Sequence, residues 1–224
     1  MGKRLILAGL LGAAPFAFAA AEAKSDSPFQ AGAAIGRCIV KADRAAAVGM
    51  LKALPLGGDQ VDWSSLSLGA ASGCRTAETS TVSVAALRGG IAQELFKRDF
   101  VEFGVQPQRA LYDLAKFDLP VEKNTMGAED PTKTLFLTAD CVARSNPNGT
   151  ERLIKSEAGS DQEQKIFESL GPWLSACQGA NRMAYGKTDL RSAIVQAAYH
   201  VSQRYWAGDM TYAGPAFRPE GARP

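Results

Sequence analysis

The chain has 224 residues, a formal net charge of +2 and a hydrophobic fraction of 46%. Without a leader, the remaining roughly 200 residues are enough for one domain or two small ones. The near-neutral charge gives no support for nucleic-acid binding, which requires a basic stripe, so we expect no nucleic-acid partner.

The first 23 residues have the pattern of a secretory signal peptide. Lys3 and Arg4 precede an apolar stretch over residues 5–18, which is too short to span a bilayer comfortably. Small residues allow cleavage after Ala19 or after Ala23, and the second site borders the polar start of the mature chain. We expect a periplasmic or secreted protein with no transmembrane segment in its mature chain. An uncleaved N-terminal anchor is the alternative.

Residues 29–100 contain signals for four helices. The expected helices cover residues 29–41, 44–54, 60–71 and 83–100. Asp43 is a favourable N-cap for the second helix, and Pro55 ends it.

Residues 130–206 contain signals for four more helices. These are expected over residues 131–144, 150–157, 160–177 and 188–206. Residues 146–149 (Asn-Pro-Asn-Gly) predict a turn, and Gly171-Pro172 predicts a kink or break in the third helix. In the last helix, apolar residues from Leu190 to Tyr205 recur on one face.

The four cysteines repeat at an interval of 103 residues, from Cys38 to Cys141 and from Cys74 to Cys177. The same offset relates Leu87-Arg88 to Leu190-Arg191, Phe96 to Tyr199, and Lys41 to Arg144. We therefore interpret the chain as two copies of one unit, over residues 24–103 and 130–206. A connecting segment (104–129) joins the copies, and an irregular tail (207–224) follows. The predicted fold is all-α, with two four-helix units packed around an approximate two-fold axis.

The repeat favours one disulfide within each copy, Cys38–Cys74 and Cys141–Cys177. In an up-down-up-down bundle the first and third helices run parallel, so their cysteines would meet at one end. The cross-copy pairing, Cys38–Cys141 with Cys74–Cys177, is the alternative. A metal site is disfavoured because 35 residues separate the cysteines of each pair and the chain has one histidine. A redox role is disfavoured because no C-x-x-C motif is present.

No catalytic motif is recognisable in the chain. The sequence lacks a nucleophile elbow, a P-loop, a dinucleotide-binding glycine motif and an EF-hand loop. Mechanisms that need two histidines are excluded because His200 is the only one. We therefore expect no catalytic residue, no cofactor and no metal, and the protein is not expected to be an enzyme.

Four charged residues are candidates for structural or recognition pairs: Arg88, Arg191, Asp140 and Glu94. The two arginines occupy equivalent positions, and a buried arginine usually pairs with a carboxylate or caps helix carbonyls. The candidate carboxylates are Asp43 and Glu94 in the first copy, and Asp140 and Asp189 in the second. The alternative is a shared anion-recognising surface.

Two further features suggest sites. Glu94 shares a helix face with apolar residues and could act as a general acid, but an ion pair with Arg98 one turn later is the simpler interpretation. The last helix carries a possible aromatic and cationic surface patch, made of His200, Tyr199, Arg204, Tyr205 and Trp206. A boundary histidine beside the core is the simpler interpretation there.

Short motifs in both copies resemble a family of secreted bacterial helical proteins with a duplicated two-cysteine repeat. The second copy reads D-C-V-A-R from Asp140, then L-S-A-C ending at Cys177, then L-R-S-A from Leu190. The first copy reads C-I-V-K and L-R-G-G-I-A-Q-E, and departs from the pattern at Arg37. No activity is associated with this family, so the resemblance implies a fold and a secreted location only.

We expect a non-catalytic periplasmic module that binds a protein partner or supports the cell envelope. A carrier of a small apolar ligand between the two copies is the second hypothesis. A helical hydrolase that uses Glu94 is the third.

Overall fold

The computed structural model describes residues 27–66, 69–75, 82–100, 130–178 and 183–206. Within these residues the protein is all-helical, with seven α-helices, one 3-10 helix and no strand. The helices are α1 (Pro28–Ala42), α2 (Arg44–Ala53), η1 (Gly69–Cys74), α3 (Val84–Asp99), α5 (Pro131–Ser145), α6 (Pro147–Lys155), α7 (Asp161–Gln178) and α8 (Lys187–Trp206). The predicted signal peptide, the connecting segment and the C-terminal tail lie outside the described residues.

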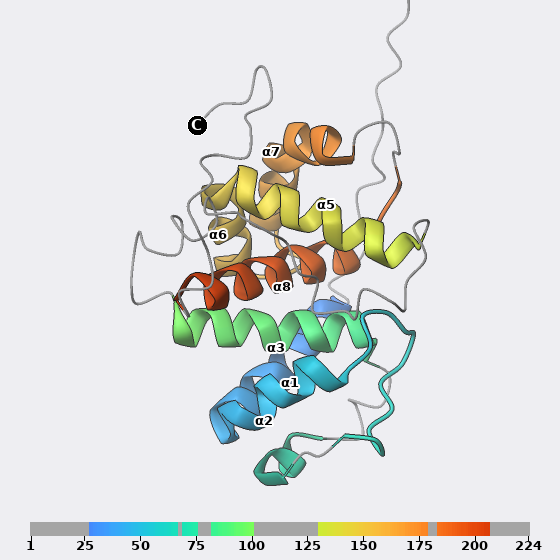
Figure 1. Ribbon diagram of the computed structural model, residues 1–224, viewed down its shortest axis with the longest axis vertical. Helices are drawn as coiled ribbons and strands as arrows, with labels where there is room; N and C mark the ends of the chain where they lie inside the picture. The colour runs from blue at the N-terminus through green and yellow to red at the C-terminus, as the bar shows by residue number, and fades with distance from the viewer. Residues whose placement is uncertain (1–26, 67–68, 76–81, 101–129, 179–182, 207–224) are drawn as a thin grey trace, which may run out of the picture.

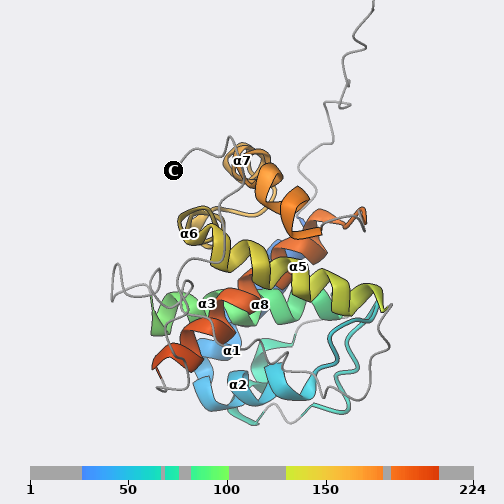
Figure 2. The same ribbon diagram turned by 45° about the horizontal axis from the view of Figure 1, so that its top comes forward.

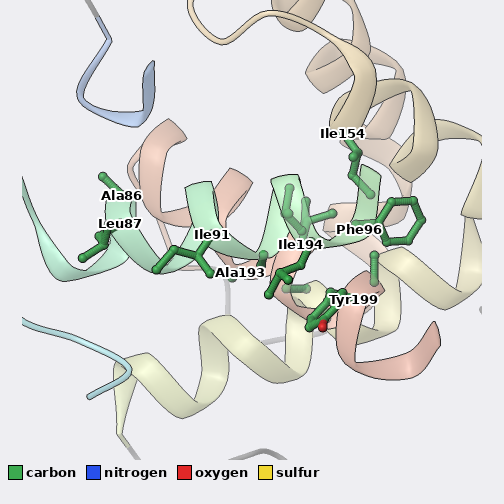
Figure 3. Close-up of a cluster of buried hydrophobic side chains, with 14 of the residues drawn as sticks. Ala86, Leu87, Ile91, Phe96, Ile154, Ala193, Ile194 and Tyr199 are labelled. Atoms are coloured by element: carbon green, nitrogen blue, oxygen red, sulfur yellow. The ribbon is translucent and has the colours of Figure 1, made fainter. Parts of the chain in front are cut away.

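The helices α3 and α8 lie side by side through the middle of the molecule (Figure 1). The helix α1 packs on the outer side of α3, and α5 packs on the outer side of α8 (Figure 2). We call α1 to α3 the first half and α5 to α8 the second half. One hydrophobic cluster joins both halves, and Figure 3 shows Ile91 and Phe96 of α3 near Ala193, Ile194 and Tyr199 of α8.

Capping residues explain where four of the helices begin. The side chain of Asp43 accepts a hydrogen bond from the Ala46 amide (3.0 Å), and that of Ser83 accepts one from the Ala86 amide (3.1 Å). Asp130 and Asn146 cap α5 and α6 in the same way. Each cap satisfies an amide that has no partner inside the helix.

The helix expected over residues 60–71 does not form over residues 60–66. The Asp62 carboxylate accepts bonds from the Ser64 amide (3.0 Å) and the Ser64 hydroxyl (2.6 Å), which holds a turn. Such local side-chain bonds compete with helix formation. Val61 and Trp63 are buried on this irregular segment, and only the short η1 helix follows it.

The second half also departs from two of the expectations, one of them only in part. Residues 146–149 do not form a separate turn, because Asn146 is the N-cap of α6 and Pro147 occupies its first position. The helix α7 continues through Pro172, so the break that was the second form of the expected kink or break is absent. Leu170 and Trp173, on either side of that proline, are both buried in the core, which holds the two parts of α7 in place.

The disulfides join Cys38 to Cys74 and Cys141 to Cys177, each across a sequence separation of 36. The expected pairing within each half is therefore confirmed. Closing a loop of this length stabilises the fold by about 4 kcal/mol in the chain-entropy model.

No helix in the described part of the chain has both the length and the apolar composition that a membrane span requires.

Candidate functional site

The helices α3 and α8 each carry a buried arginine next to the point where their backbones lie close together. A methyl group added at Gly89 would lie 2.8 Å from the Cα of Ser192. Gly89 and Ser192 are 103 residues apart, so the two helices touch at positions related by the sequence offset. Arg88 and Arg191 directly precede these two residues.

Arg191 is only 1% exposed; both of its terminal nitrogens are hydrogen-bonded, while its Nε has no hydrogen-bond partner among the described residues. Its Nη1 donates to Glu163 Oε1 (2.6 Å), and its Nη2 donates to Gln93 Oε1 (2.8 Å) and to the Ser156 carbonyl (2.8 Å). The guanidinium carbon lies 4.6 Å from the centre of the Phe29 ring. Burial lowers the pKa of Arg191, and the charge of Glu163 opposes that shift.

The expected partners of Arg191, Asp140 and Asp189, are both wrong. Glu163 takes that place because its backbone and side chain are fixed by the start of α7. Its amide donates to Ser160 Oγ (3.2 Å), and its Oε2 accepts from the Gly159 amide (2.7 Å). The capping-box glutamate of α7, which the sequence pattern locates, is therefore also the residue that neutralises Arg191.

Arg88 is also buried, at 3% exposed, but its partners are neutral. Its Nε donates to Gln196 Oε1 (2.8 Å), and its Nη1 donates to the carbonyls of Leu51 (2.7 Å) and Leu54 at the end of α2. No carboxylate of the described residues lies within ion-pair distance of it.

The expected ion pair of Arg88 with Asp43 or Glu94 is therefore wrong. Arg88 instead caps helix carbonyls, which carry the partial negative charge of a helix C-terminus. Burial lowers the pKa of Arg88 to about 10.

Asp140 is 1% exposed and pairs with Arg144 one turn later, with an Nη2–Oδ2 distance of 2.5 Å. Burial raises the pKa of Asp140 to about 7, and the charge of Arg144 opposes that shift. The other carboxylate oxygen, Oδ1, has no hydrogen-bond partner. Asp140 thus forms a structural ion pair with Arg144 in the second half and is not a partner of Arg191.

Glu94 lies between two cations on the edge of α3. Its carboxylate is 3.4 Å from Arg37 Nε and 3.2 Å from Lys97 Nζ. The expected partner, Arg98, instead donates to the Val40 carbonyl (2.8 Å). This polar setting gives no support for a general acid on an apolar face.

The expected surface patch on α8 does not include Tyr199, which is 3% exposed. The Tyr199 ring packs 5.8 Å from that of Phe100, and its hydroxyl donates to Asp99 Oδ2 (3.4 Å). Burial raises the pKa of Tyr199, and Asp99 adds to that shift. The helical period points position 199 toward the core, while His200 is half-buried. The side chains of Arg204, Tyr205 and Trp206 lie outside the description.

A cavity of about 170 Å³ lies between α2, α3 and α8. Its lining residues are Val48, Leu51, Lys52, Arg88, Ala92, Gln196, Tyr199, His200 and Gln203. We call it the α2–α3–α8 cavity. It brings Arg88 and Tyr199, and the half-buried His200, together with a largely apolar wall from both halves.

A wider groove of about 680 Å³ lies between α1, α3 and the loop before α7. Arg37, Lys97 and Lys155 contribute positive charge to it. Glu94 pairs with the first two, and Glu151 pairs with Lys155 (2.5 Å). Glu157 also lines the groove, so three carboxylates lie beside the three cations and the groove has no net positive charge to attract an anion.

In the described ranges, no three histidine, cysteine, aspartate or glutamate side chains lie close enough to hold a metal ion.

Comparisons with models of protein families, with curated proteins and with solved structures returned no match. The function is therefore argued from the residues of this chain alone.

Proposed function

We propose that the chain is a non-catalytic binding protein of the periplasm or the cell exterior that carries a small ligand between its two helical halves. The α2–α3–α8 cavity carries this proposal, since its wall comes from both halves and combines apolar side chains with two buried polar ones. Small-molecule sites usually have this composition. The two disulfides fit an oxidising compartment.

The proposal includes an approximate two-fold relation between the halves. Arg88 bonds to Gln196, and Arg191 bonds to Gln93, so each arginine reaches the glutamine of the other half. Both the arginines and the glutamines are separated by the offset of 103 residues. Reciprocal bonds of this kind, together with the Gly89–Ser192 contact, are what two equivalent units around a two-fold axis would form.

The test of the carrier is to fill the cavity. Ala92 is fully buried on the cavity wall, so Ala92→Leu places extra volume there without adding a polar group. Native mass spectrometry of the protein recovered from its own compartment should show a bound small molecule, which Ala92→Leu loses. Ala34→Leu, at an exposed position of α1, is the matched control and should keep the molecule. Equal retention by both variants would contradict the carrier.

A second candidate function is binding of an envelope protein in the charge-balanced groove. The groove is wider than the cavity and opens between α1 and the α6–α7 loop, which supports a macromolecular partner. A photo-crosslinker at Ala34 in the groove should then capture one specific envelope protein. The same crosslinker at Gly49, exposed on α2, should not. Capture of the same proteins from both positions would count against this function.

A further inference from the structure

The two buried arginines differ in one respect that bears on binding. Arg191 has the carboxylate of Glu163 at 2.6 Å, whereas Arg88 bonds only to two carbonyls and an amide oxygen. The position 103 residues before Glu163 is Gln60, which is neutral and exposed. A buried cation usually has a counter-charge, because removing an isolated charge from water is costly. Among the described residues, Arg88 has none.

Beside Arg88 lies a second group with an unused hydrogen bond. The Arg88 Nε can only donate, so the oxygen of the Gln196 amide must face it. That orientation leaves Gln196 Nε2 as a donor, and this buried atom has no hydrogen-bond partner. Gln196 is 6% exposed and lines the cavity, as Arg88 does. The Nη2 of Arg88 also makes no hydrogen bond with the described residues.

The rest of the cavity lining is mostly apolar, with Lys52, His200 and Gln203 as its other polar residues. Val48, Leu51 and Ala92 line it together with Tyr199, whose polar hydroxyl is already bonded to Asp99 and Gln203. The volume of about 170 Å³ is close to that of engineered apolar cavities of about 150 Å³ that bind benzene. The site therefore suits a single ring or a short alkyl chain.

We infer that the α2–α3–α8 cavity binds a small monocarboxylate with an apolar ring or short chain, its carboxylate on Arg88 and Gln196 Nε2. The ligand carboxylate would supply the negative counter-charge to Arg88, as the carboxylate of Glu163 does for Arg191. This inference rests on the proposed carrier function and adds to it the chemical class of the ligand.

The experiment is calorimetric titration of the mature chain at neutral pH with benzoate and with its neutral isostere benzamide. We expect benzoate to bind with one-to-one stoichiometry and benzamide to bind weaker by about tenfold or more, because charge-assisted hydrogen bonds are lost. In Gln196→Glu, an internal carboxylate takes the place of the ligand, so benzoate affinity should fall by a similar factor. This variant keeps the size of the side chain and gives Arg88 a counter-charge, so it should fold.

Two arginine variants locate the site. Arg88→Met should lose benzoate binding. Arg98→Met is the matched control, because Arg98 lies on the same helix, also donates to a backbone carbonyl, and does not line the cavity. This variant should bind benzoate as the parent chain does.

The outcomes separate the ligand class from the carrier function. Benzamide binding as tightly as benzoate, with both lost in Ala92→Leu, would overturn the carboxylate assignment and leave the carrier intact. Undiminished benzoate binding in Gln196→Glu would also overturn the assignment. No binding of either probe, with no bound molecule in the native protein, would overturn both.

Discussion

The first half packs α1 against α3 through glycines, whereas the second half packs α5 against α8 through alanines. A methyl group added at Gly36 would lie 2.5 Å from the carbonyl carbon of Gly90, so these two backbones are in direct contact. The positions 103 residues later are Ala139 and Ala193, both fully buried. Because the smallest side chain at a crossing limits how closely the backbones approach, we expect α5 and α8 to lie farther apart than α1 and α3.

The buried arginines at equivalent positions of the two halves also have different partners. Both arginines line a cavity, but Arg191 is neutralised by Glu163, while Arg88 has no carboxylate partner among the described residues. An arginine whose charge is satisfied by the protein acts as a structural link. An arginine whose charge is not satisfied leaves a polar position that a ligand can complete.

The largest expected effect tests this contrast directly. Arg191→Met should lower the free energy of unfolding by about 3–5 kcal/mol, because it leaves Glu163 buried and unpaired. Arg88→Met leaves only neutral groups unbonded and should cost about 1–2 kcal/mol. Urea denaturation measures both. Equal losses would show that Glu163 does not make the difference between the halves.

The next effect concerns Asp140, whose equivalent in the first half is the exposed Arg37. Its folded-state pKa of about 7 lies above the unfolded value of about 3.9. The folded state thus binds more protons at Asp140 between these values, so the contribution of Asp140 to stability is fully present below about pH 4 and is lost as the pH rises through 7. The loss is up to about 4 kcal/mol. Urea denaturation across this pH range should show it in the parent chain.

Asp140→Asn provides the control for this pH dependence. The variant keeps the size of the side chain but cannot titrate. Its free energy of unfolding should therefore lack the fall with rising pH that Asp140 causes. A slope that is the same in both proteins would assign the pH dependence to other groups.

A smaller effect tests the glycine contact. Gly36→Ala should lower the free energy of unfolding by about 1–3 kcal/mol, because the backbone of α3 cannot move aside without disturbing the core. Ala139→Gly in the second half should cost about 1 kcal/mol, mainly from helix propensity. Thermal unfolding compares the two. A stabilising Gly36→Ala would show that α1 and α3 can separate freely.

The smallest effect has the opposite sign. Gly49 is an exposed position of α2 at which an added methyl group meets nothing within 4 Å. Gly49→Ala should therefore raise the free energy of unfolding by about 0.4–1 kcal/mol, through helix propensity and a less flexible unfolded chain. A lower free energy of unfolding in this variant would show that the helix propensity of residue 49 does not limit the stability of α2.

The sequence by itself determined most of the helices and both disulfides. Caps such as Asp43 and Ser160 act within three or four residues, so their effect can be read locally. The cysteine pairing followed from the interval between equivalent residues. The missing helix near Asp62 is the exception. There the Asp62 carboxylate accepts a hydrogen bond from the Ser64 amide and holds a turn that competes with the helix.

Only the tertiary structure decided the partners of the arginines. Gln93 lies 98 residues from Arg191, and Gln196 lies 108 residues from Arg88, yet each forms a buried hydrogen bond with its arginine. The offset of 103 residues relates the glutamines too, but sequence spacing cannot say which side chains face one another across the α3–α8 contact. The cavity beside Arg88 arises from that same crossing, because it lies where α2 and two helices from different halves fail to fill the space between them.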